Sequence, residues 1–411
     1  MGILEILIII SLLLFPLGEL VRIEIFKNII LHPINISMSL LCIYWIYLQI
    51  KNKKNIFKVE GAKPIIIFSS IALISLLVNL SWLKINEFTT SIMYLVRWLL
   101  FASIYFAVKD TSPYFKKKIL GKLLVLVGII ILILGLIQVF FYSDLISLYK
   151  FGRDKHMYRL FSVFLDPNFT GTFLVLYLLF IASLFFNNLK RKKLRLSIFY
   201  ATIASITLIA IYMTYSRGAL LMCLASSTIF FILIKRKKLI LLIISITILY
   251  AYIISPNFYI ENTNLFRVNS SKERIKSTQI AIQIIEKNPV FGVGFNTYRY
   301  ALEKYNFRSL NTLYPSHADA GTDNSFLFIL ATSGILGLLA YLSIFFMLFK
   351  KVYRRARYEK NILAAAVFSS GIGLIVNAQF INSLFFWPIM LWMWTMLSIV
   401  DSNRSPLSES N

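Results

Sequence analysis

Long apolar runs, separated by short polar gaps, make up most of the chain. A helix needs about 20 mostly apolar residues to cross the hydrocarbon core of a bilayer. The pattern therefore predicts an all-α protein, a polytopic transmembrane bundle of about 12 helices. The predicted spans lie near residues 3–17, 34–50, 64–83, 91–108, 120–142, 168–186, 197–214, 219–234, 239–255, 324–349, 362–380 and 383–400.

Basic residues cluster in every second gap between these spans. The clusters are Lys51, Lys53, Lys54, Lys58 and Lys63; Lys116, Lys117 and Lys118; Lys190, Arg191, Lys192, Lys193 and Arg195; Lys235, Arg236, Lys237 and Lys238; and Lys350, Lys351, Arg354, Arg355 and Arg357. Cytoplasmic loops of membrane proteins carry an excess of Lys and Arg. These gaps and both chain termini are therefore predicted to face the cytoplasm, in a multi-pass protein of the cytoplasmic (inner) membrane. The outward gaps are 18–33, 84–90, 143–167, 215–218, 256–323 and 381–382.

Composition supports a membrane protein and narrows its class. The chain is 58% hydrophobic and 15% charged, which is more apolar surface than a soluble domain of 411 residues can bury. Its formal net charge of +25 is explained by the basic cytoplasmic gaps, so it does not indicate nucleic acid. Cys42 and Cys223 lie in apolar runs and are predicted to be packing residues.

The outward gap 256–323 is much longer than an ordinary connection, and loops of that length are usually functional or disordered. Within it, SSKERIKSTQIAIQIIEKNP predicts an amphipathic helix with an apolar stripe. Ser270 and Glu273 have capping-box spacing, Ile275, Ile282 and Ile285 mark the stripe, and Pro289 ends the helix. An ordered outer loop over a helical bundle predicts a site on the outer face.

The chain is thus divided into three parts. Residues 1–255 are predicted to hold transmembrane helices 1–9, and residues 256–323 the extracytoplasmic loop with its amphipathic helix. Residues 324–411 are predicted to hold transmembrane helices 10–12 and a cytoplasmic tail.

Arginines in the outward gaps are the first candidates for chemistry, because the charge bias of topology does not account for them. They include Arg159 before the LDPN turn, Arg217 in YSRGALL, Arg274 at the start of the loop helix, and Arg299. Arg97 lies inside the fourth span, where a charge usually faces a cavity or a partner. Guanidinium is well suited to forked hydrogen bonds with phosphate oxygens. The alternative is that each arginine reaches a lipid phosphate at the membrane surface.

The stretch PSHADAGTDNSFLFILATSG, residues 315–334, brings acids and a histidine to the start of an apolar helix. Asp323 or Thr322 is in the position of a helix N-cap. His317 could serve in proton transfer, since an imidazole titrates near neutral pH. The spacing of His317, Asp319 and Asp323 does not resemble a zinc site, and no metal or cofactor is predicted.

Two glycines in PVFGVGFNTY, Gly292 and Gly294, suggest close approach of backbone. A dinucleotide-binding loop would need a third glycine at position 297, which is Thr297. The glycines are therefore predicted to form a tight turn that allows the backbone to approach another part of the protein.

The order of these motifs resembles the O-antigen ligase and Wzy-type polymerase family. SRG ends an outer hairpin, a long outer loop follows with an arginine before a helix ending in NPVFGVG, and DNSFLFILATSGILGLL starts the next span. The resemblance extends from RLFSVFLDPN through the tenth span, whereas the first five spans match only in number and hydropathy.

The resemblance implies a GT-C-like, metal-independent membrane glycosyltransferase without a cofactor. Its donor would be a glycan on undecaprenyl pyrophosphate at the outer face, and its acceptor another glycan or lipid A core. By position, Arg217, Arg274 and Arg159 match arginines that hold the pyrophosphate. Arg97, Arg299 and Asn324 are further candidates for substrate contact.

The proton acceptor is left open between two residues. Family members often carry His-Asn directly before the apolar helix, whereas this chain has Asp323-Asn324. Either Asp323 takes that role or His317 supplies it from six residues upstream, and His317 is favoured.

Other activities remain as alternatives. A polymerase would join repeat units and a ligase would move the finished chain to a terminal acceptor; the lack of an acceptor-specific element favours a polymerase. A polysaccharide flippase or transporter would place ionisable residues deep in several spans. A SEDS-type peptidoglycan polymerase also has many spans and an outer loop.

Overall fold

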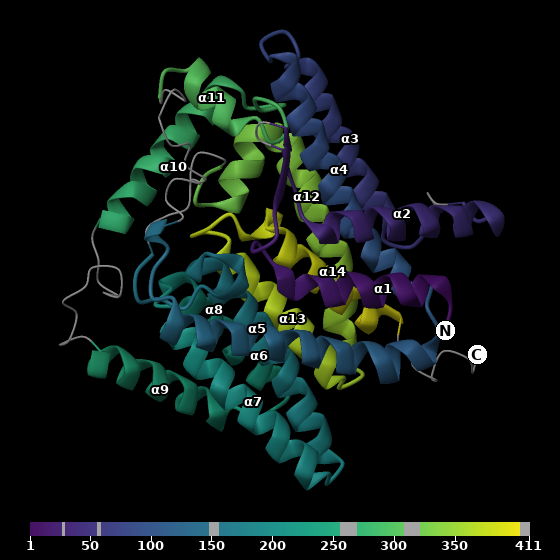
Figure 1. Cartoon of the computed structure of the whole chain (residues 1–411), viewed down its shortest axis with the longest axis vertical. Coiled ribbons are helices and arrows are strands. Elements are labelled where there is room, and N and C mark those ends of the chain that lie inside the picture. Colours follow the sequence, from purple (N-terminus) through teal and green to yellow (C-terminus); the bar gives the residue numbers. More distant parts are fainter. Residues whose placement is uncertain (27–28, 56–58, 148–155, 255–268, 308–320, 403–411) are drawn as a thin grey trace.

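The computed structural model describes the chain except for residues 27–28, 56–58, 148–155, 255–268, 308–320 and 403–411. In this part the fold is almost entirely helical, apart from a small hairpin of β1 (Ile23–Phe26) and β2 (Ile29–Leu31). The α-helices are α1 (Ile3–Leu14), α2 (Pro33–Lys51), α3 (Ala62–Val78), α4 (Ile85–Lys109), α5 (Gly121–Phe141), α6 (Pro167–Lys190), α7 (Leu194–Met213), α8 (Arg217–Leu233), α9 (Lys238–Ile254), α10 (Asn269–Lys287), α11 (Tyr298–Lys304), α12 (Ser325–Arg357), α13 (Ile362–Asn377) and α14 (Trp387–Ser402). The all-α class is confirmed (Figure 1).

A helix occupies most of each predicted span, and α10 and α11 are additional helices in the long outer loop. Six described helices are long and apolar enough to cross a membrane by themselves: α2, α4, α5 with the turn before it, α6, α7 and α12. Several others, including α3, α8 and α13, are shorter apolar helices. A multi-pass helical membrane protein is therefore supported, and the count of about twelve crossings stays a prediction.

Residues from the basic gaps gather at one end of the bundle. Lys109 Nζ, at the end of α4, lies 2.9 Å from Glu60 Oε2 and 2.7 Å from Asp401 Oδ2. Lys351 of α12 pairs with the same two acids, and Tyr105 donates to Asp401 Oδ2 at 2.7 Å. These contacts fasten α4, α12 and α14 together at the end predicted to be cytoplasmic.

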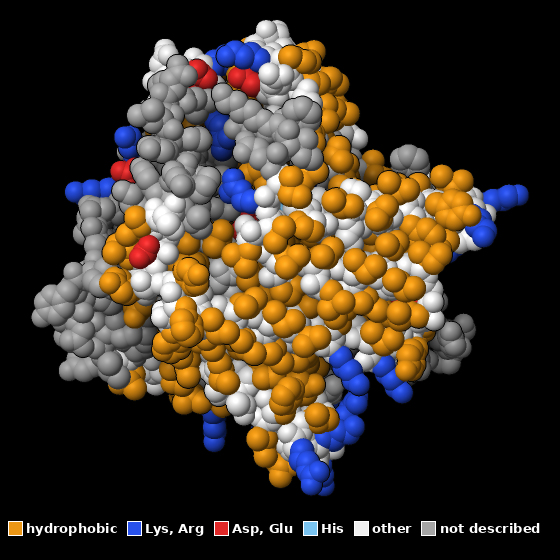
Figure 2. All heavy atoms as spheres, in the orientation of Figure 1, with side chains coloured by type: hydrophobic (Ala, Val, Ile, Leu, Met, Phe, Trp, Pro, Cys, Tyr) orange, Lys and Arg blue, Asp and Glu red, His pale blue; other side chains and the backbone are white. Residues whose placement is uncertain are grey.

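Residues in or beside the outward gaps also contact one another. Trp387 Nε1 donates to Glu19 Oε1 at 2.9 Å, and Asn324 Nδ2 donates to Gln379 Oε1 at 3.1 Å. Lys304 of α11 lies over the ring of Trp82, 4.3 Å from its centre. The assignment of these gaps to the outer face stays a prediction. Figure 2 shows one face of the molecule, where hydrophobic side chains cover a broad area and Lys and Arg lie mostly outside it.

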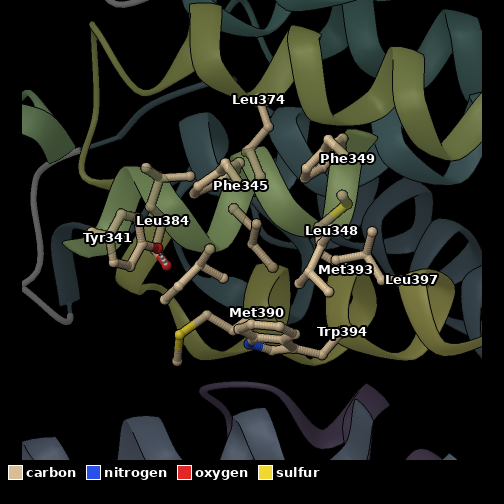
Figure 3. A pocket seen from close by; sticks show the side chains of 12 residues that line it. Tyr341, Phe345, Leu348, Phe349, Leu374, Leu384, Met390, Met393, Trp394 and Leu397 are labelled. Atoms are coloured by element: carbon tan, nitrogen blue, oxygen red, sulfur yellow. Dashed lines mark hydrogen bonds between the residues drawn. The ribbon is translucent and has the colours of Figure 1, made fainter. Parts of the chain in front are cut away.

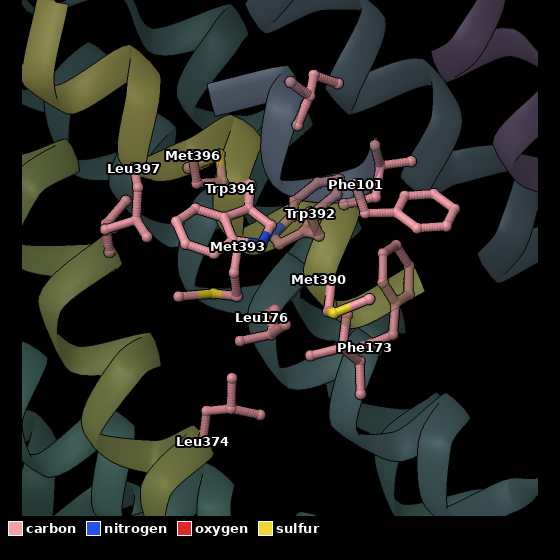
Figure 4. Close-up of a cluster of buried hydrophobic side chains, with 14 of the residues drawn as sticks. Phe101, Phe173, Leu176, Leu374, Met390, Trp392, Met393, Trp394, Met396 and Leu397 are labelled. Atoms are coloured by element: carbon pink, nitrogen blue, oxygen red, sulfur yellow. The ribbon is translucent and has the colours of Figure 1, made fainter. Parts of the chain in front are cut away.

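Aromatic side chains of α6 and α14 form the centre of the bundle (Figure 4). Trp392 and Phe173 are fully buried, with ring centroids 5.2 Å apart in an edge-to-face arrangement. Cys223 is buried and Cys42 half-buried, both as free thiols, so the packing interpretation of the cysteines is confirmed.

Helix α12 is broken at Gly334, where the backbone adopts φ 66°. The predicted glycine turn fits into this break. Val293 N donates to Ala331 O and Gly294 N to Thr332 O, both at 2.9 Å, while Ile335 N donates to Pro289 O at 2.9 Å. The turn thus satisfies backbone groups that the break releases, as a membrane interior requires.

Helix α3 holds the same turn from the other side. Asn79 Nδ2 donates to Gly292 O at 3.0 Å, and Ser75 Oγ lies 2.6 Å from Phe291 O and 2.8 Å from Thr332 O. The expected close approach of backbone is therefore found, and its partner is α12.

The predicted apolar stripe of the loop helix was partly wrong. Ile275 and Ile282 are exposed, whereas Ala281 and Ile284 are fully buried. The buried face packs against Tyr298 of α11 and residues of α12. The partners of α10, rather than the spacing of its isoleucines, determine which face is buried.

Candidate functional site

The SRG segment forms the turn between α7 and α8. Ser216 is the N-cap of α8, and its Oγ accepts a hydrogen bond from Ala219 N at 3.4 Å. Arg217 is the first residue of the helix and is half-buried. The residue before the cap, Tyr215, has φ 49°, which is uncommon for a residue other than glycine. The turn therefore holds Arg217 at a helix N-terminus in a specific, strained conformation.

Arg274 lies close enough to Arg217 for the two positive charges to interact. Arg274 comes from the first half of α10 and is also half-buried. The two residues are 57 positions apart in sequence, and the outer loop brings them together. Like charges repel, so two partly desolvated guanidiniums in proximity favour an anion between or beside them. Of the arginines predicted to contact substrate, Arg217 and Arg274 are the two whose charges the structure brings within reach of each other.

Arg159 has a different environment. It is 3% exposed and lies beneath the SRG turn. Its Nε donates to Thr214 O at 2.8 Å, and its Nη2 donates to Asn168 Oδ1 at 3.2 Å. The Arg159 guanidinium is therefore hydrogen-bonded to other residues of the protein, and little of its surface is accessible to a ligand.

The LDPN turn that opens α6 contains residues that sequence reasoning did not assign. Asp166 caps α6, accepting from Asn168 N at 2.6 Å and from Phe169 N at 3.2 Å. Its Oδ2 lies 3.8 Å from His156 Nε2. Burial alone would raise the pKa of the Asp166 carboxyl, but His156, the backbone N–H of Phe169 and the charge of Arg159 together lower the pKa to about 2. The carboxylate therefore stays ionised at physiological pH.

Asn168 links this turn to the SRG turn. Its Oδ1 accepts hydrogen bonds from Arg159 Nη2 and, at 3.0 Å, from Ser216 Oγ. The Asp-Pro-Asn sequence is a recognisable helix start, with an Asp cap and Pro at the first helical position. That signal locates Asn168, but only the fold shows that its side chain faces Ser216.

At the start of α12, the N-cap is Asn324, so the assignment of the cap to Asp323 or Thr322 was wrong. Asn324 Oδ1 accepts from Phe326 N at 2.9 Å and from Leu327 N at 3.1 Å. Thr322 instead donates to Asn324 O at 2.6 Å. A hydrogen-bonding role in the protein is thus shown for Asn324, whose contact with substrate stays a prediction.

Asp323 is exposed beside this cap. Its negative charge and, above all, burial raise the pKa of the Tyr298 phenol on α11. His317, the other candidate for proton transfer, lies outside the described residues, as does Asp319.

The two remaining candidate arginines lie elsewhere in the structure. Arg97 donates to Ile30 O, lies 4.9 Å from the ring centre of Tyr94, and acts on the charge state of His32. Arg299 is half-buried on α11. Arg97 is therefore placed in a different group of residues from Arg217 and Arg274.

A pocket between α12, α13 and α14 is lined by apolar side chains (Figure 3). They include Phe345, Leu374, Met390, Met393 and Trp394. Such a lining cannot solvate an anion, so this pocket is not a candidate for a phosphate-binding site. Among the described residues, no group of three or more His, Cys, Asp or Glu side chains has the arrangement of a metal site.

Comparison with known families gives a match to part of the chain. The family described as O-antigen ligase matches residues 202–342, which include Arg217, Arg274, Asp323 and the glycine turn. A search of curated proteins found no match. The resemblance stated from the motifs is confirmed for this part of the chain.

Proposed function

We propose that this chain, which carries an O-antigen ligase domain in residues 202–342, transfers a glycan from undecaprenyl pyrophosphate at the outer face of the cytoplasmic membrane. The observation that supports this proposal most is the convergence of Arg217 and Arg274. Both lie in the matched region, in gaps that are predicted to face outward.

The arrangement suits a displacement at the anomeric carbon. An acceptor hydroxyl attacks that carbon, its proton passes to a base, and the bond from the carbon to the pyrophosphate oxygen breaks. Undecaprenyl pyrophosphate leaves with the electron pair. Preorganised positive charge stabilises the oxygens on which negative charge develops, and Arg217 and Arg274 supply it in this proposal.

The base is expected to be His317, because imidazole has an ordinary pKa near neutrality whereas a carboxylate does not. His317→Ala should lower the transfer rate by about 10²–10⁴-fold. Asp323→Asn should keep the rate within about 10-fold of wild type, since it retains the shape of the side chain. The measurement is the initial rate of glycan transfer by each purified variant.

The reverse result would assign the base to Asp323. Full activity of both variants would place proton transfer at neither residue. Asn324 remains the cap acceptor of α12 in both variants, so an unchanged Tm is expected for each and serves as the control for damage to the helix start.

The acceptor decides between the two versions of this function. A polymerase extends one lipid-linked repeat unit with another and gives a ladder of oligomers. A ligase transfers glycan only when lipid A core or another terminal acceptor is added. We expect the ladder, and product that depends strictly on lipid A core would assign the chain as a ligase.

A further inference from the structure

The turn that presents Arg217 contains a strained residue. Tyr215 has φ 49°, in the left-handed region that residues with a Cβ rarely adopt. Such a conformation persists only where surrounding contacts determine it. The direction of the Arg217 side chain follows from this turn, because Arg217 begins α8 two residues later.

Arg159 supplies contacts of that kind. Its guanidinium is buried beneath the turn and donates to the carbonyl of Thr214 at 2.8 Å, with a longer contact of 3.5 Å to the carbonyl of Tyr215. A buried cation bonded to these two consecutive carbonyls favours the turn conformation over its alternatives.

Asn168 completes the arrangement from α6. One oxygen, Asn168 Oδ1, accepts from Arg159 Nη2 at 3.2 Å and from Ser216 Oγ at 3.0 Å. Gly171, one turn further along α6, allows the close approach: a Cβ there would lie 2.6 Å from Ala219 Cβ and 3.0 Å from Thr214 Oγ1. The start of α6 thus packs directly on the SRG turn.

We propose that Arg159 and Asn168 are positioning residues that hold Arg217 in place for the donor pyrophosphate, and that Arg159 is not itself a donor ligand. This inference rests on the proposed function, in which Arg217 binds the pyrophosphate. It replaces the role expected for Arg159 from its position in the sequence, because that role needs an accessible guanidinium and this one is 3% exposed.

The test uses a change that removes the strain. Arg159→Ala should lower the turnover of glycan transfer by about 10²-fold, the loss that a displacement of about 1 Å can cause. Glycine at position 215 adopts the turn without strain. In the Tyr215→Gly background, Arg159→Ala should therefore lower the turnover at least about 10-fold less than it does in the wild-type background. A residue that binds the donor directly cannot be replaced in this way.

The same Tyr215→Gly change in Arg274→Ala is the matched control, and no recovery is expected there. Absence of recovery in Arg159→Ala/Tyr215→Gly, in protein that remains monodisperse with an unchanged Tm, would overturn the inference. Wild-type protein without glycan product would instead contradict the proposed function, so the two failures are distinguishable.

Asn168 provides a second test if Arg159→Ala does not fold. Asn168→Asp keeps an acceptor oxygen for Arg159 and Ser216, and should remain within about 10-fold of wild-type turnover. Asn168→Ala removes the acceptor and should lose about 10²-fold in turnover. Equal activity of the Asp and Ala variants would contradict a role for this oxygen in positioning Arg217.

Discussion

Arg217→Ala is expected to lower glycan transfer by about 10²–10³-fold, which is the loss typical of removing one preorganised donor from a developing oxyanion. The structure places Arg217 at the N-terminus of α8, within electrostatic reach of Arg274. Arg217→Lys keeps the charge but loses the forked geometry, so an intermediate rate is expected. The measurement is the initial rate with lipid-linked glycan at saturating donor.

Arg357→Ala is the matched control for Arg217→Ala. It removes the same charge from an exposed position at the C-terminal end of α12, and wild-type activity is expected. Arg217→Ala/Arg274→Ala should lose less than the product of the two single losses, because both residues act on one group. A fully active Arg217→Ala variant would remove the arginine pair from the site.

Gly292→Ala is expected to destabilise the fold by several kcal/mol and to prevent normal accumulation in the membrane. Gly292 has φ 65°, and an added Cβ would lie 2.4 Å from Thr332 C and 2.6 Å from Ala331 O. The backbone conformation alone costs about 1–2 kcal/mol for an L-residue, and overpacking typically adds about 1–3 kcal/mol. The measurement is the Tm of the detergent-solubilised protein.

Gly121→Ala serves as the control for this substitution. Gly121 begins α5, and an added Cβ would meet nothing within 4 Å. Its Tm should be unchanged or higher, since Ala stabilises a helix by about 1 kcal/mol relative to Gly. A normal Tm for Gly292→Ala would contradict the tight fit of the turn against α12.

Much of the fold follows from hydropathy because a bilayer imposes a length on each apolar helix. The two glycines also predicted a tight turn with a close approach of backbone, and in the structure Gly292 and Gly294 both adopt positive φ. The part of the protein that this turn approaches was not predictable. The break at Gly334 lies in an apolar run that otherwise continues through α12.

The site was predictable in part. Motif order singled out Arg217 and Arg274, which the outer loop brings together. The cap of α12 was assigned wrongly because Thr322, Asp323 and Asn324 are all acceptable caps, and only the backbone selects one. The role of Arg159 depends on burial under a turn 55 residues later in sequence, which local patterns do not encode.

The most direct test of the central claim is product formation in liposomes. These contain the purified protein, a lipid-linked glycan repeat unit and either a glycan or a lipid A core acceptor. The proposed function predicts a new glycan linkage and the release of undecaprenyl pyrophosphate with each transfer, both about 10²–10³-fold slower in Arg217→Ala. Movement of the lipid-linked glycan across the bilayer, with no new linkage to any acceptor, would contradict it.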